Sequence, residues 1–312
     1  MGWSERDIPD LSGRTALVTG ANSGLGLHVS RALAQHGARV LMGARDRDRG
    51  EAAVARVRGA APLATVELVD VDLGSLAAVR AAAEDVRSRT DDRLDLLFAN
   101  AGVMAVPRRE TSDGFELQLG TNHLGHFALV GQVLPALLAA PAARVVSTSS
   151  QAHRSGRMDF DDLMGERSYS RFGAYGQSKL ANLLFTAELQ RRLAASGARA
   201  TAVAGHPGWS ATDLQAGATS GVRVPGARAV MGLANRLFAQ SDAAGALPLL
   251  RAGTDPAVEG GDYLGPDGRG EMRGAPVRVG RSERAESVAD AQRLWAESER
   301  LTGVVYELPV PA

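Results

Sequence analysis

The sequence predicts an α/β protein with a doubly wound parallel sheet, built as a single domain over residues 1–312. Short apolar strands alternate with helical segments from residue 14 onward, and this βαβα rhythm is typical of parallel sheets whose strands are joined by crossover helices. The strands are apolar throughout, as expected for a sheet that helices cover on both faces. No linker or break in composition divides the sequence.

Apolar runs and turn residues set the bounds of each predicted element. The first helix is expected to stop at Gly37 and the fourth near Pro141, because glycine and proline end helices. Strands are expected at residues 14–19, 39–42, 66–69, 94–98, 144–148 and 200–204, and helices at residues 25–36, 47–58, 75–88, 123–138 and 175–193.

The last third of the sequence has weaker signals. Residues 213–240 are rich in Gly, Ala, Arg and Pro, and we expect a substrate lid or a broken helix there. Residues 253–280 are glycine-rich and turn-like. They lead into an amphipathic C-terminal helix over residues 285–301, which carries Leu294 and Trp295.

The composition excludes several classes of protein. The formal net charge is zero, which argues against a nucleic acid or an anionic membrane surface as the main partner. There is no cysteine, so thiol catalysis, disulfides and cysteine-ligated metals are excluded. No signal peptide is visible at the N-terminus, and no run of about 18 apolar residues predicts a membrane span. We therefore expect a cytoplasmic protein.

A glycine-rich segment follows the first strand and opens the first helix. It reads Thr19-Gly20-Ala21-Asn22-Ser23-Gly24-Leu25-Gly26. Glycines allow a tight turn and a close approach of the backbone to a pyrophosphate, and the helix N-terminus supplies N–H donors. Such a pattern alone is weak in a chain with 36 glycines, but its place between a strand and a helix predicts a dinucleotide site.

The end of the second strand indicates which dinucleotide binds. An acidic residue there would accept a hydrogen bond from the adenosine 2′-hydroxyl of NAD, but this chain has Ala44 followed by Arg45. A guanidinium binds a 2′-phosphate bidentately, so we predict NADP(H) as the cofactor. The acidic neighbour Asp46 complicates this interpretation, and a solvated Arg45 in an arginine-rich loop is the alternative.

Lys179 is the only lysine among the 35 lysines and arginines. It follows Tyr175 by four residues, which is one helical turn. An ammonium is a compact charge on a flexible stem, unlike the planar guanidinium that the chain uses elsewhere. A cation about 4 Å from a phenol is worth roughly three pKa units at an effective dielectric constant near 20. We therefore expect Lys179 to lower the pKa of Tyr175 towards neutrality and make it an acid/base.

In their order along the chain, these motifs resemble those of the short-chain dehydrogenase/reductase family. After the glycine segment come Asn100-Ala101-Gly102, Asn122, Ser150, Tyr175 with Lys179, and His206-Pro207-Gly208. The resemblance covers about residues 12–270 and implies a Rossmann fold. Each motif follows a strand or lies on the helix after it, at the edge where ligands bind in open α/β sheets.

The resemblance implies four catalytic residues. Tyr175 is expected to be the general acid in carbonyl reduction and the base in alcohol oxidation. Ser150, the second serine of a pair, is expected to hydrogen-bond the substrate oxygen. Lys179 is expected to tune Tyr175 and to hold the nicotinamide ribose. Asn122 is expected to hold a water that connects the lysine to solvent; a helix N-cap is a second role, compatible with the first.

The resemblance also implies the other contacts of the site. The residues expected to bind NADP(H) are Gly20, Asn22, Ser23, Gly24, Leu25, Gly26, Arg45, Asp72, Leu73, Asn100, Ala101, Gly102, Thr148, Tyr175, Lys179, Pro207, Gly208 and Thr212. Met104, His153 and Trp209 are expected in the substrate pocket with Ser150 and Tyr175. Asp72 is alternatively a helix cap. His206 is expected to make a structural contact, and no metal is predicted.

The spacing of the catalytic residues indicates a branch of the family. Ser150 and Tyr175 lie 25 residues apart, farther than in many members. The extra residues around Arg157–Leu163 are similar to those of retinol-dehydrogenase-like members, which use NADP(H). This likeness implies an NADP-dependent oxidoreductase that transfers a hydride between the nicotinamide and a lipophilic alcohol, aldehyde or ketone.

Two other functions stay open at this point. A non-catalytic NADP-binding sensor on the same fold is the main alternative, although the presence of all four catalytic residues favours an enzyme. A role in assembly is the third, because the helices at residues 123–138 and 175–193 pair in a four-helix dimer interface in the family. The sequence leaves open whether the protein is a homo-oligomer, which direction the reaction takes and what the physiological substrate is.

Overall fold

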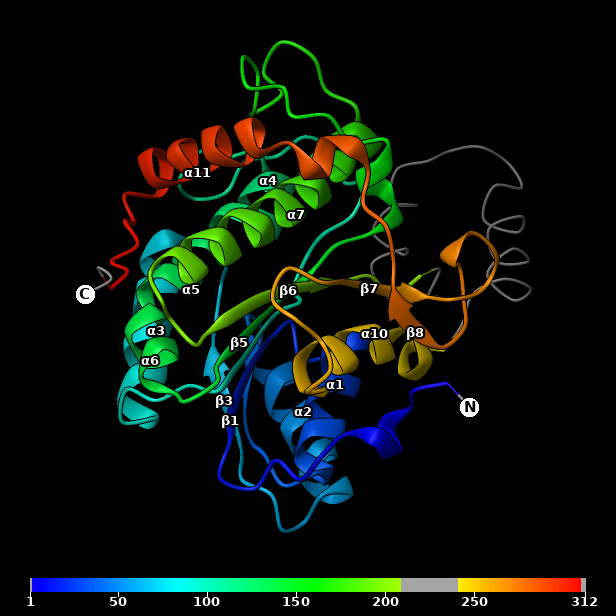
Figure 1. Cartoon of the computed structure of the whole chain (residues 1–312). Coiled ribbons are helices and arrows are strands. Elements are labelled where there is room, and N and C mark those ends of the chain that lie inside the picture. The colour runs from blue at the N-terminus through cyan, green and yellow to red at the C-terminus, as the bar shows by residue number, and fades with distance from the viewer. Residues whose placement is uncertain (1, 209–240, 310–312) are drawn as a thin grey trace, which may run out of the picture.

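An eight-stranded sheet with the order β3-β2-β1-β4-β5-β6-β7-β8 runs through the molecule (Figure 1). The computed structural model describes residues 2–208 and 241–309. The strands are β1 (Thr15–Thr19), β2 (Arg39–Ala44), β3 (Val66–Asp70), β4 (Leu96–Ala99), β5 (Arg144–Thr148), β6 (Thr201–Gly205), β7 (Tyr263–Pro266) and β8 (Pro276–Arg278). Strands β1 to β7 are parallel, and the strand order reverses between β1 and β4, where ligands bind in such sheets.

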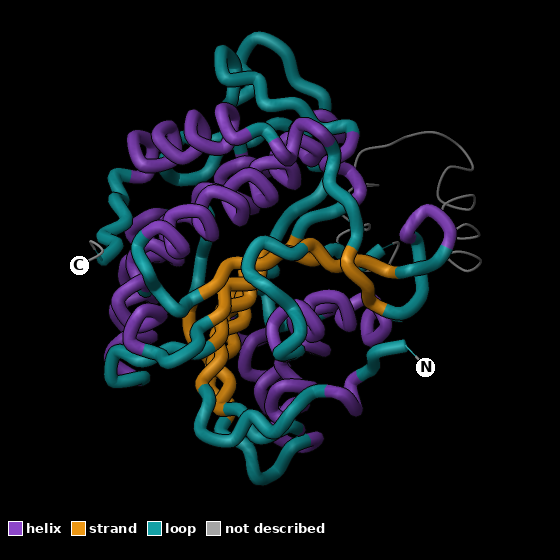
Figure 2. The backbone as a smooth tube through the Cα atoms, in the orientation of Figure 1, coloured by secondary structure: helices purple, strands orange, loops and turns teal. Residues whose placement is uncertain are grey.

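Helices cover both faces of the sheet, as Figure 2 shows. The helices are α1 (Gly24–Gln35), α2 (Arg47–Ala60), α3 (Leu76–Arg89), α4 (Leu117–Leu119), α5 (Gly125–Gln132), α6 (Leu134–Ala139), α7 (Arg171–Ala195), α10 (Asp242–Thr254) and α11 (Val288–Thr302). Helices α1, α2 and α10 pack together on one face, while α3, α5, α6 and α7 cover the other. Helix α11 packs on the outside of α7.

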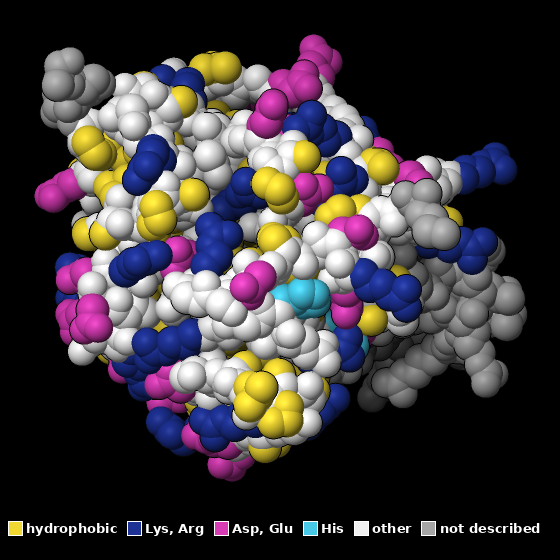
Figure 3. All heavy atoms as spheres, turned by 60° about the horizontal axis from the view of Figure 1, so that its bottom comes forward, with side chains coloured by type: hydrophobic (Ala, Val, Ile, Leu, Met, Phe, Trp, Pro, Cys, Tyr) yellow, Lys and Arg dark blue, Asp and Glu magenta, His cyan; other side chains and the backbone are white. Residues whose placement is uncertain are grey.

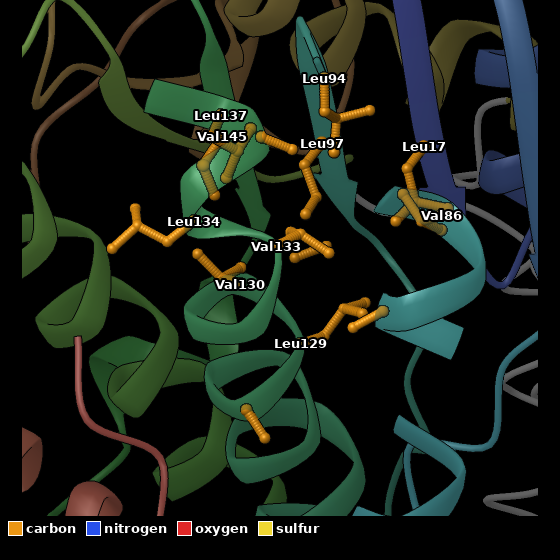
Figure 4. Packing of buried hydrophobic residues seen from close by; sticks show 14 of the residues in the cluster. Leu17, Val86, Leu94, Leu97, Leu129, Val130, Val133, Leu134, Leu137 and Val145 are labelled. Atoms are coloured by element: carbon orange, nitrogen blue, oxygen red, sulfur yellow. The ribbon is translucent and has the colours of Figure 1, made fainter. Parts of the chain in front are cut away.

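The core follows from this layering. Leu17, Leu97 and Val145 come from neighbouring strands and lie in one buried cluster with Val86 of α3 and with Val133 and its neighbours on α5 and α6 (Figure 4). Each buried leucine or valine contributes roughly 1.5–3 kcal/mol of transfer free energy. Basic and acidic side chains are interspersed over the face shown in Figure 3, in keeping with the zero net charge.

The structure agrees with the predicted fold class and corrects it in detail. The edge strand β8 runs antiparallel to β7, so the sheet is not parallel throughout. The helix expected at residues 123–138 is divided into a π-helical turn at Gly120–Leu124 followed by α5 and α6. Pro135 at the start of α6 explains the second division, because its ring and missing N–H interrupt the hydrogen-bond ladder.

The sequence signals were weakest around residues 240–301. Helix α10 contains Pro248, which reads as a helix breaker, and the stretch expected to be turns contains β7 and β8. The final helix starts at Val288, because residues Glu283–Glu286 form a separate 3-10 turn. The expected lid at residues 213–240 lies outside the described residues.

The C-terminal helix is held by an aromatic cluster. The Trp295 ring stacks on Phe185 of α7 at a centroid distance of 5.9 Å, and the Arg192 guanidinium lies 4.3 Å from the Trp295 ring centre. The Tyr306 hydroxyl donates to the Phe127 carbonyl at 2.7 Å. Along the described parts of the chain, every helix is too short or too polar to cross a bilayer.

Candidate active site

A cavity of about 710 Å³ opens at the carboxyl ends of the parallel strands. Every residue expected to bind the cofactor lines it, except Thr212, which lies outside the described residues with Trp209. These lining residues are Gly20, Asn22, Ser23, Gly24, Leu25, Gly26, Arg45, Asp72, Leu73, Asn100, Ala101, Gly102, Thr148, Tyr175, Lys179, Pro207 and Gly208. The cavity therefore joins the glycine segment to three of the four predicted catalytic residues, Ser150, Tyr175 and Lys179, in one continuous space.

The glycine segment leaves no room for side chains. Gly20 has a φ of 65°, and a Cβ there would lie 2.8 Å from Cα of Ala101. A Cβ on Gly26 would lie 2.3 Å from the Gly20 carbonyl oxygen and 2.6 Å from Nδ2 of Asn100. The glycines thus let the chain after β1 pack directly against the chain after β4.

The first turn of α1 is suited to an anion. Ser23 is its N-cap residue, yet the Ser23 side chain makes no capping hydrogen bond, and the first turn contains no acidic residue. The N–H groups of a helix start and its positive dipole end then face the cavity without an anionic side chain of their own. This arrangement fits the diphosphate of a dinucleotide.

Two charged residues, Arg45 and Asp46, follow β2 and line the cavity at the predicted ribose site. The Asp46 carboxylate accepts from the Arg49 backbone N–H at 3.0 Å and so caps α2. Arg47 pairs with Asp70 at 2.7 Å. Arg45 lines the cavity and is exposed. One oxygen of the acidic residue that complicated the sequence interpretation is therefore engaged in a helix cap, while Asp46 still lines the cavity beside Arg45.

Asp72 lies in the turn before α3 and lines the cavity after β3. Its Oδ1 atom accepts from the Gly74 N–H at 2.9 Å within this turn. The N-cap residue of α3 is Ser75, whose Oγ atom accepts from the Ala78 N–H at 3.3 Å. The alternative that Asp72 is a helix cap is therefore wrong, and its place in the cavity wall is as expected.

Tyr175 and Lys179 both lie on the buried face of α7. The Lys179 Nζ atom is 5.7 Å from the centre of the Tyr175 ring and donates to the Thr148 carbonyl oxygen at 3.1 Å. The Ser150 side chain lies near the Tyr175 hydroxyl, close enough to oppose the rise in the pKa of Tyr175 that burial causes. The spacing of four residues therefore brings the phenol, the ammonium and the serine to one end of the cavity.

The electrostatics of this pair differ from the expectation. Burial raises the pKa of Tyr175, and the nearby Ser150 side chain opposes that rise. Burial also lowers the pKa of Lys179 to about 8, because desolvation disfavours the ammonium. The prediction that Lys179 brings the pKa of Tyr175 towards neutrality is therefore wrong for this structure.

The two neighbouring serines, Ser149 and Ser150, make different contacts. Ser149 is buried, and its hydroxyl donates to the Lys179 carbonyl oxygen at 2.9 Å. Ser150 caps the short 3-10 turn Gln151–Arg154, where its Oγ atom accepts from the Ala152 N–H at 3.2 Å. Ser149 is thus engaged in holding β5 against α7, whereas Ser150 faces Tyr175.

Thr148 leaves one polar atom for a ligand. Its carbonyl oxygen accepts from Lys179 and, at 3.0 Å, from the Asn182 amide. Its hydroxyl is buried without a hydrogen-bond partner among the described residues, although Thr148 lines the cavity. A buried polar group without a partner costs free energy, so this hydroxyl fits the polar edge of a nicotinamide.

Asn122 lies beneath the cavity rather than in its wall. It sits inside the π-helical turn, so it is not an N-cap. Its side chain accepts from the Val103 N–H at 2.8 Å and donates to Ser178 Oγ at 2.9 Å. Its own carbonyl oxygen contacts the His126 ring at 3.0 Å. These contacts fasten the chain after β4 to α7.

His153 does not line the cavity. It is fully buried, its Nδ1 atom contacts the Ser150 carbonyl oxygen at 2.7 Å, and its Nε2 atom accepts from the Ser282 N–H at 3.3 Å. The expectation of a substrate contact is therefore not supported. Met104 does line the cavity. His206 makes the structural contact expected of it, with Glu271 at 2.9 Å.

Several cavity residues were not predicted. Phe172 precedes Tyr175 by three residues on α7, and this helical spacing was a usable signal. Gly270, Glu271 and Met272 enter from the β7–β8 loop, whose glycine-rich sequence gave no sign of a site. Within the described ranges, His, Asp and Glu side chains form no group of three that suits a metal ion.

Comparisons with known proteins agree with this geometry. The sequence profile of the short chain dehydrogenase family matches residues 14–222. Retinol dehydrogenase 13 of Homo sapiens is 39% identical over 316 residues, covering 99% of this chain and 90% of that protein. Polyprenol dehydrogenase of Mus musculus is 40% identical over 302 residues, covering 95% and 86%. A solved structure of an uncharacterized Mycobacterium paratuberculosis protein has a TM-score of 0.81 at 42% identity, covering 99% and 100%.

Proposed function

The chain belongs to the short-chain dehydrogenase family, and we propose that it is an NADP-dependent oxidoreductase that reduces a lipophilic aldehyde or ketone. The observation that carries the proposal is the meeting of Tyr175, Ser150 and Lys179 in the cavity that also contains the glycine segment. Hydride transfer needs a dinucleotide and a proton donor side by side, and this cavity has residues for both.

The protonation of Tyr175 favours reduction at neutral pH. Because burial raises its pKa, the phenol keeps its proton and can donate it to a carbonyl oxygen. Ser150 donates a hydrogen bond to the same oxygen as negative charge develops there. Lys179, 5.7 Å from the centre of the Tyr175 ring, would hold the nicotinamide ribose, and bound NADPH would supply the hydride.

The preference for NADP rests on Arg45. The end of β2 presents Ala44 and then an exposed guanidinium, while the carboxylate of Asp46 is engaged at the start of α2. A 2′-phosphate with its negative charge would form charge-assisted hydrogen bonds to Arg45. The 2′-hydroxyl of NAD offers no such partner.

The substrate class rests on the apolar mouth of the cavity. Met104, Phe172 and Met272 line it, and Phe172 is 65% exposed. An exposed aromatic side chain beside a catalytic tyrosine is suited to cover an apolar substrate. The names of the retinol and polyprenol dehydrogenases point to lipophilic alcohols for those relatives.

A coenzyme and substrate screen tests the proposal. Purified protein is expected to oxidise NADPH in the presence of lipophilic aldehydes or ketones, with a lower KM for NADPH than for NADH. Arg45→Ala is expected to raise the KM for NADPH roughly 10- to 100-fold, the value of a charged hydrogen bond, without changing that for NADH. Arg47→Ala is the matched control, because Arg47 pairs with Asp70.

Two results would overturn parts of this account. A wild-type preference for NADH would contradict the role of Arg45. NADPH binding without turnover of any aldehyde, ketone or alcohol, together with no effect of Tyr175→Phe, would favour a sensor over an enzyme.

A further inference from the structure

Glu271 places a carboxylate in the wall of the catalytic end of the cavity. It lies in the loop between β7 and β8, and its side chain is 24% exposed. Three side chains converge on it: the Gln151 amide, His206 Nε2 at 2.9 Å and the Arg154 guanidinium at 3.1 Å. Two of these belong to the short turn that begins directly after Ser150.

All three neighbours present donors to this carboxylate. His206 Nδ1 accepts from the Gly208 N–H at 3.2 Å, so the proton of the neutral ring is on Nε2 and points at Glu271. Gln151 accepts from Arg154 through Oε1 at 2.8 Å, so its NH₂ group faces Glu271. Arginine has only donors. These three donors need a side chain whose two terminal atoms are both hydrogen-bond acceptors. Among ordinary side chains, only a carboxylate meets this need.

The backbone at Glu271 also argues for a side-chain role. Its φ of 54° lies in the left-handed region, which is unfavourable for a residue with a Cβ and natural for glycine. The preceding residue, Gly270, has a φ of 65°, which glycine adopts without strain. A glutamate held in a strained conformation by three hydrogen bonds is typical of a position with a function.

The carboxylate joins three segments of the active site. Gln151 and Arg154 carry the turn that Ser150 caps, and His206 leads from β6 into the cavity-lining Pro207 and Gly208. The β7–β8 loop packs closely on this segment, since a Cβ on Gly208 would lie 2.5 Å from the Met272 carbonyl oxygen. Met272 itself lines the cavity and is exposed.

We propose that Glu271 is a positioning residue that fixes the Ser150 turn and clamps the β7–β8 loop as the substrate wall. The carboxylate does not touch the reacting atoms in this role. It keeps the Ser150 hydroxyl directed at Tyr175 and keeps Met272 at the mouth. The proposal rests on the proposed carbonyl reduction for its effect on activity, whereas the clamp itself is a property of the loop.

Glu271→Gln is the sharpest test, because glutamine keeps the shape and replaces one acceptor with a donor. We expect kcat for a lipophilic aldehyde to fall roughly 10- to 100-fold, the range for loss of a charged hydrogen bond, with a smaller change in KM. The dissociation constant for NADPH should stay at the wild-type value. A uniform loss of cofactor binding and turnover would indicate a merely structural role and would overturn the proposal.

A second measurement does not depend on turnover. Arg269 and Arg273 are exposed residues of the same loop, so trypsin can report its opening. Cleavage after these two residues, followed by mass spectrometry, should be several-fold faster in Glu271→Gln than in the wild type. Unchanged cleavage would refute the clamp even if the wild type reduced none of the carbonyl compounds tried, a result that would contradict only the proposed function.

Two glycine variants separate the side chain from backbone strain. Glu271→Gly removes the carboxylate and relieves the left-handed φ, so we expect activity to fall although the backbone is better suited. Asp91→Gly is the matched control, since Asp91 has a φ of 47° on the exposed turn after α3. It should leave both activity and loop cleavage unchanged. Wild-type activity in Glu271→Gly would contradict the proposal.

Discussion

The two ends of the cavity are built in different ways. At the cofactor end the glycine segment and the start of α1 place backbone atoms in the cavity wall, and Arg45 is the one side chain proposed to bind the 2′-phosphate. At the catalytic end side chains form the surface. Tyr175, Lys179 and Ser150 meet over the strand ends, and Glu271 holds the wall behind them. Backbone geometry fixes the first end, and side-chain chemistry defines the second.

This difference predicts how each end fails. A change at the backbone end forces atoms apart, so cofactor affinity and stability are lost together. A change at the side-chain end removes a proton donor or a charge while the fold remains, so turnover is lost and binding is kept. The following variants examine this contrast, beginning with the largest expected effect.

Tyr175→Phe removes the proton donor and keeps the ring. We expect kcat to fall roughly 10²- to 10⁴-fold, the usual contribution of general acid catalysis. Steady-state assays with NADPH and a lipophilic aldehyde measure the loss. Turnover within a few-fold of the wild type would show that another group donates the proton.

Lys179→Met isolates the buried ammonium. Its folded pKa of about 8 lies below the ordinary value of 10.5, so the unfolded state binds more protons between these two values. Wild-type stability should therefore rise relative to the variant by about 3 kcal/mol as the pH increases from 8 to 10.5.

Denaturant unfolding of both proteins across this range makes the comparison. If the free energies of unfolding of the two proteins changed with pH in parallel, burial would not lower the pKa of Lys179, and this account would be contradicted. Activity that depends on the ammonium should decline above about pH 8, where the folded protein loses this proton.

Gly26→Ala tests the backbone end. The added Cβ would lie 2.3 Å from the Gly20 carbonyl oxygen, so we expect a loss of about 1–3 kcal/mol in stability and weaker NADPH binding. Gly59→Ala is the control, because a Cβ there meets nothing within 4 Å on α2. It should stabilise the protein by about 0.5–1 kcal/mol. Equal effects of the two substitutions would contradict the close packing at Gly26.

Phe172→Ala is expected to have the smallest effect. Phe172 covers the mouth and touches no reacting group in the proposed mechanism, so KM for lipophilic substrates should rise with little change in kcat. About 1–2 kcal/mol, or roughly a tenfold change, is expected for the lost apolar contact. Short-chain aldehydes are the control, because they do not reach the mouth.

The sequence predicted the residues that line the glycine-rich end of the cavity, and the reason is physical. A close approach of the backbone to a ligand requires glycine. The glycines between Gly20 and Gly26 therefore predict this geometry directly. Tyr175 and Lys179 were visible because one helical turn fixes their spacing. The direction of the Tyr175 pKa shift was not visible in the sequence, because burial arises only from the packing of the whole fold.

The parts that the sequence missed depend on contacts between distant segments. Glu271 is one charged residue in a glycine-rich stretch, and its role appears only when β7 and β8 bring it to Gln151. The expected pairing of the helices at residues 123–138 and 175–193 between two copies of the chain also depends on contacts between distant segments. Residues 175–189 of α7 include no exposed side chain, because α11 and the following residues pack around them. Oligomeric state therefore cannot be read from apolar helices alone.

The NADPH dissociation constant of Tyr175→Phe, measured by fluorescence titration beside the wild type, tests the contrast between the two ends most directly. The account predicts an unchanged dissociation constant in a variant whose turnover is lost, because phenylalanine keeps the ring that lines the cavity and removes only the hydroxyl that donates the proton. A variant that loses NADPH binding together with turnover would contradict the separation of the two ends.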